Sequence, residues 1–164
     1  MKGYGAMVEY MTPKILLRKA TLADATAIAN VYLVSRKIFV AFAPLAHSDV
    51  SIYRWIREIL IPANQVVVAE EEGIIVGMMA LSRKEGIGWI DQLYLSLEAI
   101  GRKIGAKLVN KAKLILGSPI RLHTFQENIE ARRFYEKNGF KILEFSDGSK
   151  NEEHCPDVLY EWHL

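Results

Sequence analysis

Two glycines and two cationic residues form the first pattern that could do chemistry, in the run "YLSLEAIGRKIGAKLV". Gly101 and Gly105 bracket Arg102 and Lys103, with a strand-like run before them and a helix-like run after them. A helix N-terminus that follows such a turn exposes unpaired backbone N–H groups, and its dipole favours an anion. The pattern predicts either a backbone cradle for phosphate groups or the capped start of an ordinary helix. The glycines alone favour the ordinary helix.

Two better-known phosphate-binding motifs are excluded. Gly105 is followed by Ala106 and Lys107, so the pattern G-x-x-x-x-G-K-[ST] is absent. The pattern G-x-G-x-x-G is absent too, and Arg121 and His123 stand about 20 residues on, where an acidic residue would bind a ribose. Nucleotide hydrolysis and hydride transfer are therefore not expected.

A second pattern lies in "HTFQENIEARRFYEKNGF", which spans residues 123–140. Asn128, Ala131 and Tyr135 recur at helical spacing and fall within roughly 60° of one another on a helix. An amide, a methyl and a phenol on one narrow stripe suit a thin polar ligand that runs along the helix. Asn128 also precedes the helix as a good N-cap, which we expect to be its main role. The stripe favours the cradle over the ordinary helix.

At these residues the chain resembles the GNAT superfamily of acyl-coenzyme A-dependent N-acyltransferases. "IDQLYLSLEAIGRKIGAKLV" and "NIEARRFYEKNGF" are similar to its two signature segments, and the N-x-x-A-x-x-F-Y-x-x-x-G-F spacing of the second is complete. The first departs from the family's Q/R-x-x-G-x-G/A, because Ile100 stands where Gln or Arg is usual and Lys103 replaces the first glycine. Gly105 is retained. A non-glycine residue can hold helical dihedrals, so we expect Lys103 not to obstruct the coenzyme.

The resemblance implies acetyl-CoA as co-substrate and transfer of its acetyl group to a primary amine by direct attack in a ternary complex. A small-molecule amine is the expected acceptor, with a protein or peptide amine as a close variant. A non-catalytic coenzyme A-binding or regulatory module on the same fold is the alternative, because the glycine segment is altered. The residues expected to contact the coenzyme are Leu93, Tyr94, Leu95, Ile100, Gly101, Arg102, Lys103, Ile104, Gly105, Ala106, Asn128, Ala131 and Tyr135.

Transfer to an amine needs a group that protonates the departing thiolate and one that stabilises the oxyanion. Tyr135 is expected to protonate the thiolate, as the tyrosine at this position often does in the family, since the pKa of a phenol lies only slightly above that of a thiol. A core tyrosine with a satisfied hydroxyl is the alternative. The oxyanion is expected to meet a backbone N–H near Leu93 to Leu95, where a bulge would turn successive groups toward one ligand.

The reaction also needs a base that takes a proton from the ammonium. Asp91 is the expected base, because "IDQL" resembles the matching run of aminoglycoside N-acetyltransferases. An aspartate needs partial burial or a relaying water for this role, and pairing with an arginine is its alternative. His47 and His123 are the next candidates, although a strand histidine such as His123 is more often a satisfied core residue.

The acceptor is expected to lie between two loops, "IFVAFAPLAHS" at 38–48 and part of "SDGSKNEEHCPDVLYEW" at 146–162. Aromatic side chains in the first loop would wall the pocket, and acidic ones in the second would attract a cationic amine. A buried connector and a solvated acidic loop are the alternatives. The residues expected to contact the acceptor are Phe39, Phe42, His47, Asp91 and Glu153.

The elements that must position these residues follow from hydrophobic periodicity. Helices are predicted over about 22–36, 49–61, 101–116 and 128–137, and the order of elements is β-α-α-β-β-β-α-β-α-β-β. The predicted fold class is α/β (α+β), with a mixed, mostly antiparallel central sheet flanked by about four helices. The resemblance adds a splayed parallel strand pair at the coenzyme site.

Length and composition predict one domain over residues 14–164, preceded by a flexible leader at 1–13, and the resemblance implies that this domain is an N-acetyltransferase. The 164 residues are 51% hydrophobic and 24% charged, which is typical of a globular protein. A net charge of +2 gives no basic footprint for nucleic acid, and the longest uncharged run, 38–48, is too short for a membrane span. The single cysteine, Cys155, excludes an intrachain disulfide, so a cytoplasmic protein is expected. No metal site is expected, and a homodimer is compatible with the sequence.

Overall fold

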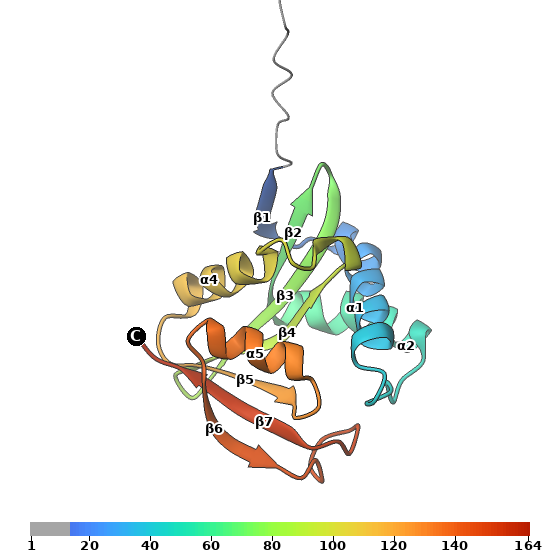
Figure 1. Cartoon of the computed structure of the whole chain (residues 1–164). Coiled ribbons are helices and arrows are strands. Elements are labelled where there is room, and N and C mark those ends of the chain that lie inside the picture. Colours follow the sequence, from blue (N-terminus) through green and yellow to red (C-terminus); the bar gives the residue numbers. More distant parts are fainter. Residues whose placement is uncertain (1–13) are drawn as a thin grey trace, which may run out of the picture.

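The structure is a computed structural model that describes residues 14–164, so the expected leader at 1–13 lies outside the described residues. Seven strands form one sheet in the order β1-β2-β3-β4-β5-β7-β6 (Figure 1). Only β4 and β5 pair in parallel; the other neighbours are antiparallel, which confirms the predicted mixed sheet. The strands are β1 (Ile15–Lys19), β2 (Gln65–Glu71), β3 (Ile74–Lys84), β4 (Ile87–Leu95), β5 (Ile120–Phe125), β6 (Lys141–Ser146) and β7 (Asp157–Trp162).

All four predicted helical segments are present, but they differ from the prediction at their ends. Those present are α1 (Ala25–Phe39), α2 (Asp49–Trp55), α3 (Ile61–Ala63), α4 (Ile104–Leu116) and α5 (Ile129–Lys137), with helical turns η1 (Leu22–Asp24), η2 (Ile56–Leu60) and η3 (Leu97–Ala99). The predicted helix at 49–61 is α2, the π-helical turn η2 and α3 in succession. It stays helical to Ala63 because Pro62 fits the first turn of α3, where its missing N–H is not needed.

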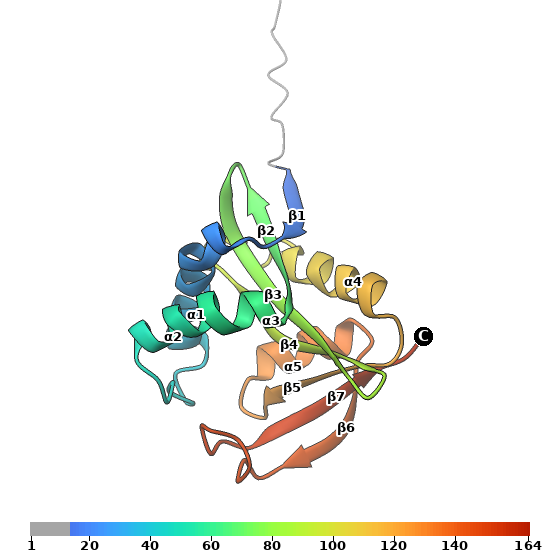
Figure 2. The same ribbon diagram turned by 180° about the vertical axis from the view of Figure 1, so that it is seen from behind.

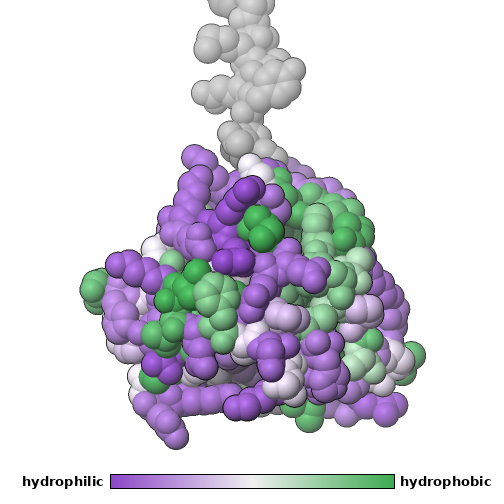
Figure 3. Space-filling model, turned by 60° about the horizontal axis from the view of Figure 1, so that its bottom comes forward, coloured by the Kyte–Doolittle hydropathy of each residue, from purple (hydrophilic) through white to green (hydrophobic). Residues whose placement is uncertain are grey.

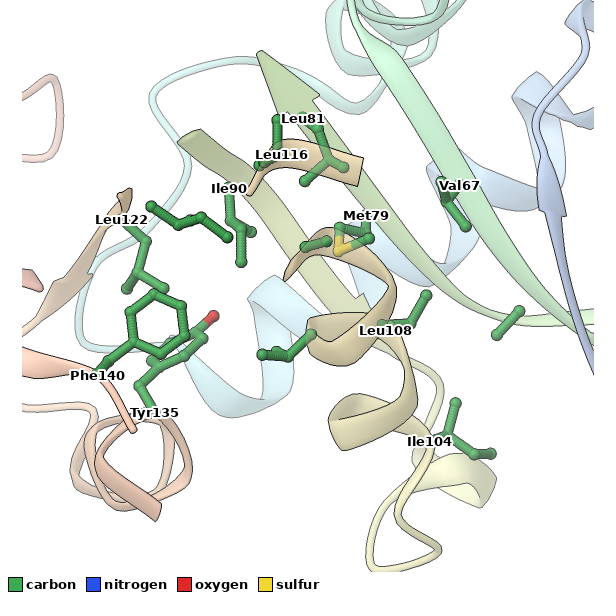
Figure 4. Close-up of a cluster of buried hydrophobic side chains, with 14 of the residues drawn as sticks. Val67, Met79, Leu81, Ile90, Ile104, Leu108, Leu116, Leu122, Tyr135 and Phe140 are labelled. Carbon is green, nitrogen blue, oxygen red and sulfur yellow. The ribbon is translucent and has the colours of Figure 1, made fainter. Parts of the chain in front are cut away.

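The helices cover the two faces of the sheet unequally. α1, α2 and α3 lie over one face, and α4 and α5 lie over the other (Figures 1 and 2). Side chains alternate between the faces along a strand, so Val68 and Met78 pack beneath α1 while Val67 and Met79 pack beneath α4 (Figure 4). On the face that carries α1, no helix of the described chain covers β5, β7 and β6 (Figure 2).

The parallel pair is short and splayed, as the resemblance implied. β4 and β5 are paired only at Gly88–Ile120 and Trp89–Arg121, and beyond these two pairs the strands separate. The C-terminal half of β4 therefore has one edge bonded to β3 and one edge open. None of the helices in the part of the chain that the structure describes has both the length and the apolar composition that a membrane crossing requires.

Candidate active site

The open edge of β4 presents backbone N–H groups toward the gap between the splayed strands. Ser96 donates its N–H to the Val76 carbonyl on β3 at 2.8 Å. Because N–H groups in an antiparallel strand alternate between the two edges, those of Leu93 and Leu95 face away from β3, into the gap. The register pairs Ile90 with Leu81 and Gln92 with Ala80, so Asp91 is the extra residue of a β-bulge. A bulge was expected near this position.

Tyr135 lies on α5 with its ring buried and its hydroxyl unbonded. The residue is only 8% exposed, and its ring contacts Phe134 and Phe140 at centroid distances of 5.1 and 5.8 Å. Its hydroxyl is directed away from α5 (Figure 4) and has no hydrogen-bond partner within residues 14–164. Burial, helped by the nearby Tyr94 phenol, raises the pKa of Tyr135 above its ordinary value. The phenol therefore stays protonated and able to donate.

The segment 101–106, which we call the cradle, exposes unpaired backbone N–H groups. α4 begins at Ile104 and not at 101, because Gly101 and Lys103 have positive φ angles of 77° and 63°. The expectation that Lys103 holds helical dihedrals is wrong: it adopts the left-handed conformation that favours glycine. Within the described chain, the N–H groups of residues 101–106 find no acceptor. The backbone is thus suited to an anion at the N-terminus of α4.

The side chains of the cradle mostly serve the fold. The Arg102 guanidinium pairs with Glu71 at the end of β2, so its charge is already matched there. The side chain of Ile104, the first residue of α4, is buried in the core, whereas Ile100 and Lys103 are exposed. A Cβ at Gly105 would lie 3.1 Å from the Phe134 ring, so this glycine lets α4 approach α5 closely.

Asn128 is the N-cap of α5, as expected. Its Oδ1 accepts the N–H of Ala131 at 3.2 Å. Ala131 and Tyr135 follow along the same helix, and both are in contact with the core beneath α4 and α5. Asn128 thus fixes the start of the stripe that was expected to lie along the ligand.

Asp91 is exposed at its bulge. Its Oδ2 accepts a hydrogen bond from the Nδ2 of Asn64 at 3.0 Å, and Asn64 also donates to the Leu81 carbonyl. The partner is thus an amide and not an arginine. The structure does not give Asp91 the partial burial that the role of base was expected to need.

The two loops expected at the acceptor end meet in space. His47 lies 3.1 Å from Glu152, and the Phe42 ring meets the Phe125 ring edge-on at 5.8 Å. Glu153 pairs with Arg36 on α1 at 3.0 Å. Among the residues expected to contact the acceptor, Phe42, His47 and Glu153 are therefore brought together. Phe39 is the last residue of α1 and is 42% exposed.

Arg36 is a residue at this end that the sequence analysis missed. It is 5% exposed, donates to the Ala43 carbonyl at 3.1 Å, and lies over the Phe125 ring at 5.5 Å. A signal existed, because Arg36 follows Tyr32 by four residues and so shares the apolar face of α1. A cation on a buried face needs an acidic partner, which the sequence alone does not identify.

His123 lies on the uncovered face, beside a half-open cavity of about 670 Å³ that is lined by β5, β6, β7 and the loop 147–153. Its side chain is 54% exposed, so the expectation of a core histidine is wrong. His123 is exposed because successive side chains of β5 point to opposite faces of the sheet. Ile120 and Leu122 point into the core beneath α5, so His123 points to the opposite face. Figure 3 shows that this end of the molecule is mostly hydrophilic, with a few apolar patches.

Comparison with a protein family and with solved structures agrees with this geometry. The family described as an acetyltransferase (GNAT) domain matches residues 62–142, which contain the splayed strands, the cradle and Tyr135. The PaiA N-acetyltransferase from Thermoplasma acidophilum, solved in complex with coenzyme A, is similar over 92% of this chain and 99% of that one, with 26% identity and a TM-score of 0.73.

Two further solved structures share the fold. The apo form of YjaB from Escherichia coli is 21% identical over 91% of this chain and 97% of that one, with a TM-score of 0.74. The ribosomal-protein-alanine N-acetyltransferase from Brucella melitensis is 20% identical over 91% and 99%, with a TM-score of 0.68. No curated protein matches the chain. From the family match and the shared fold, this chain belongs to the GNAT superfamily of acetyltransferases.

Proposed function

We propose that the chain transfers an acetyl group from acetyl-CoA to a small-molecule primary amine, by direct attack of the amine in a ternary complex. The observation that carries this proposal is the separation of β4 from β5 after two residue pairs, next to the unpaired N–H groups of the cradle. A gap with free backbone donors on one wall and an anion site at its end suits a thioester on a long phosphorylated arm.

The described residues fit such a co-substrate. The N–H groups of residues 101–106 would hold the phosphates, and the open edge of β4 would hold the amide groups of the arm. Asn128 and Ala131 would lie along it on α5. When bound, acetyl-CoA supplies the activated acetyl group and a thiol leaving group.

The residues of the chain have three roles in the transfer of the acetyl group. One backbone N–H on the open edge of β4, that of Leu93 or Leu95, donates to the carbonyl oxygen, where negative charge develops as the C–N bond forms. Tyr135 donates a hydrogen bond to the sulfur as the C–S bond breaks. Because burial raises the pKa of Tyr135, complete proton transfer to sulfur is uphill, and its main effect is to stabilise the developing thiolate. The third role is to remove a proton from the ammonium.

The cavity beside β5 supports a small acceptor. Its volume of about 670 Å³ lies within the range of sites that hold small molecules, and the loop 147–153 lines one side of it. A cavity of this size can hold a compact amine whole, whereas a long peptide would extend beyond it. We therefore favour a compact amine over a peptide amine as the acceptor. The formation of a homodimer remains a prediction from the sequence.

Two measurements test the proposal. Titration calorimetry with acetyl-CoA measures binding, and a thiol-release assay over a broad panel of primary amines measures transfer. We expect binding together with release of one thiol per acetylated amine.

A non-catalytic coenzyme-binding module is the second candidate, favoured by the left-handed Lys103 where the family has glycine. Tight binding with no thiol release from any amine would establish it and reject the enzyme. Failure to bind acetyl-CoA would reject both candidates.

A further inference from the structure

We propose that His123 is the general base of this transferase, and that the cavity beside it receives the acceptor amine. This inference rests on the proposed function and names the group that takes the proton. Among the candidate bases, His123 alone lines the cavity next to the splayed strands.

His123 stands close to the point where the gap opens. Arg121 is the last β5 residue paired with β4, and His123 follows it by two residues on the same face of the strand. Its ring stacks on Trp89, the last paired residue of β4, with the centroids 5.6 Å apart and the planes 17° from parallel. The ring therefore lies against β4 at the point where the two strands begin to separate, and it also lines the cavity.

Asp157 on β7 orients the imidazole. His123 Nδ1 lies 3.9 Å from Asp157 Oδ2, which is longer than a hydrogen bond and within ion-pair distance once the ring is protonated. Asp157 is itself fixed by the Ser146 hydroxyl and by Asn151 Nδ2. A carboxylate on the Nδ1 side stabilises the imidazolium that forms when Nε2 accepts a proton. Nε2 is thus the atom that would face the ammonium.

The charged groups around the cavity favour a cationic ligand. β6 contributes Glu144, β7 contributes Asp157, and the loop contributes Asp147 and Lys150. The loop residue Glu153 is already paired with Arg36. On β5 itself, the Arg121 guanidinium is neutralised by Glu161 of β7. Unpaired carboxylates therefore outnumber cations among the residues that line the cavity, which favours an ammonium over an anion there.

The other two candidates are placed less well. Asp91 is exposed and accepts a hydrogen bond from Asn64, and a carboxylate in water is a weak base toward an ammonium. His47 pairs with Glu152 at the outer surface, where both side chains are more than half exposed. An imidazole changes charge near neutral pH, which matches the proton transfer that this step needs.

Acetyl transfer to the amine releases two protons from the ammonium and one thiolate. His123 Nε2 takes one proton from the acceptor ammonium, and the freed nitrogen lone pair forms the C–N bond. The electron pair of the broken C–S bond goes to sulfur, and the second amine proton leaves to water as the amide forms. The imidazolium then returns its proton to solvent through the cavity.

The test compares His123→Gln with the wild type and with Asp91→Asn in the thiol-release assay, from pH 6 to pH 10. We expect His123→Gln to lower kcat/KM on the order of 100-fold near neutral pH, and the loss to shrink at high pH, where the free amine needs no base. Asp91→Asn should stay within a few-fold of wild type. Added imidazole should partly restore His123→Ala. Calorimetry should show unchanged acetyl-CoA affinity for His123→Gln.

The outcomes separate the two proposals. A wild-type protein that acetylates no amine rejects the proposed function, and this inference with it. An active wild type with an undiminished His123→Gln variant, or with a loss that is equal at all pH values, rejects His123 alone. Asp157→Asn tests the orienting role of Asp157: we expect kcat/KM to fall near neutral pH and to recover at high pH, with unchanged acetyl-CoA affinity. A wild-type pH profile of kcat/KM in this variant would contradict that role.

Discussion

The guanidinium of Arg36 on α1 lies 3.0 Å from the carboxylate of Glu153, which follows it by 117 residues. This ion pair fastens the loop between β6 and β7 onto the end of α1, and Phe125 lies under the guanidinium. Removing the acidic partner leaves a buried cation without its counter-charge, which costs more than the loss of a surface pair. We therefore expect Glu153→Gln to lower the free energy of unfolding by about 2 kcal/mol, measured by urea denaturation.

The neighbouring Glu152 provides the matched control for this prediction. It pairs with His47, and both side chains are exposed. Glu152→Gln should change the free energy of unfolding by about 0.5 kcal/mol or less. Equal losses in the two variants would mean that burial of Arg36 does not set the strength of the loop contact.

Lys103 occupies a left-handed conformation in which a glycine costs less free energy. Lys103→Gly should therefore raise the free energy of unfolding by about 1 kcal/mol. Lys103→Ala, which removes the same charge but keeps the Cβ, should give no such gain. In calorimetry we expect Lys103→Gly to bind acetyl-CoA no more tightly than the wild type. A tenfold gain in affinity would show that the lysine obstructs the coenzyme.

Much of the fold could be predicted from the sequence, because the apolar periodicities are regular and the turns carry glycine or proline. The start of α4 could not, since the conformation of Lys103 depends on how the chain must turn between η3 and α4. The stripe from Asn128 to Tyr135 was visible because helical spacing alone places it. By contrast, the exposure of His123 depends on which face of β5 a helix covers, and this is a property of the whole sheet.

The pairing of Arg36 with Glu153 likewise could not be predicted from the sequence. Each residue carries a local signal, a cation on an apolar helix face and an acid in a polar loop. The sequence does not show that these two segments meet, because the loop 147–156 reaches α1 only through the order β5-β7-β6 in the sheet. Long-range partners of this kind are what a single sequence leaves open.

Asp24 at the end of η1 makes stability depend on acid pH. Its carboxylate accepts two hydrogen bonds from Arg18, which lower the pKa of Asp24 to about 2. A carboxyl whose pKa is lower in the folded state stabilises the fold above its unfolded pKa, and this contribution is lost as pH falls from about 5 to about 2. We expect Asp24→Asn to cost about 1 kcal/mol at pH 7 and only a small part of this near pH 2. Asp49→Asn, at an exposed pair with Lys37, is the control and should show little effect. An Asp24→Asn loss that is undiminished near pH 2 would contradict the assignment.

Tyr135 should matter to turnover and not to folding. Its hydroxyl has no partner among residues 14–164, so Tyr135→Phe should unfold like the wild type and keep its affinity for acetyl-CoA. If the hydroxyl stabilises the departing thiolate, kcat should fall about 10- to 100-fold. The matched variant is Tyr160→Phe, because the Tyr160 hydroxyl donates to Glu136 at 2.8 Å and accepts from Arg132. Tyr160→Phe should lose about 1 kcal/mol of stability while kcat is retained. An unchanged kcat in Tyr135→Phe would remove Tyr135 from the reaction and leave it a core residue.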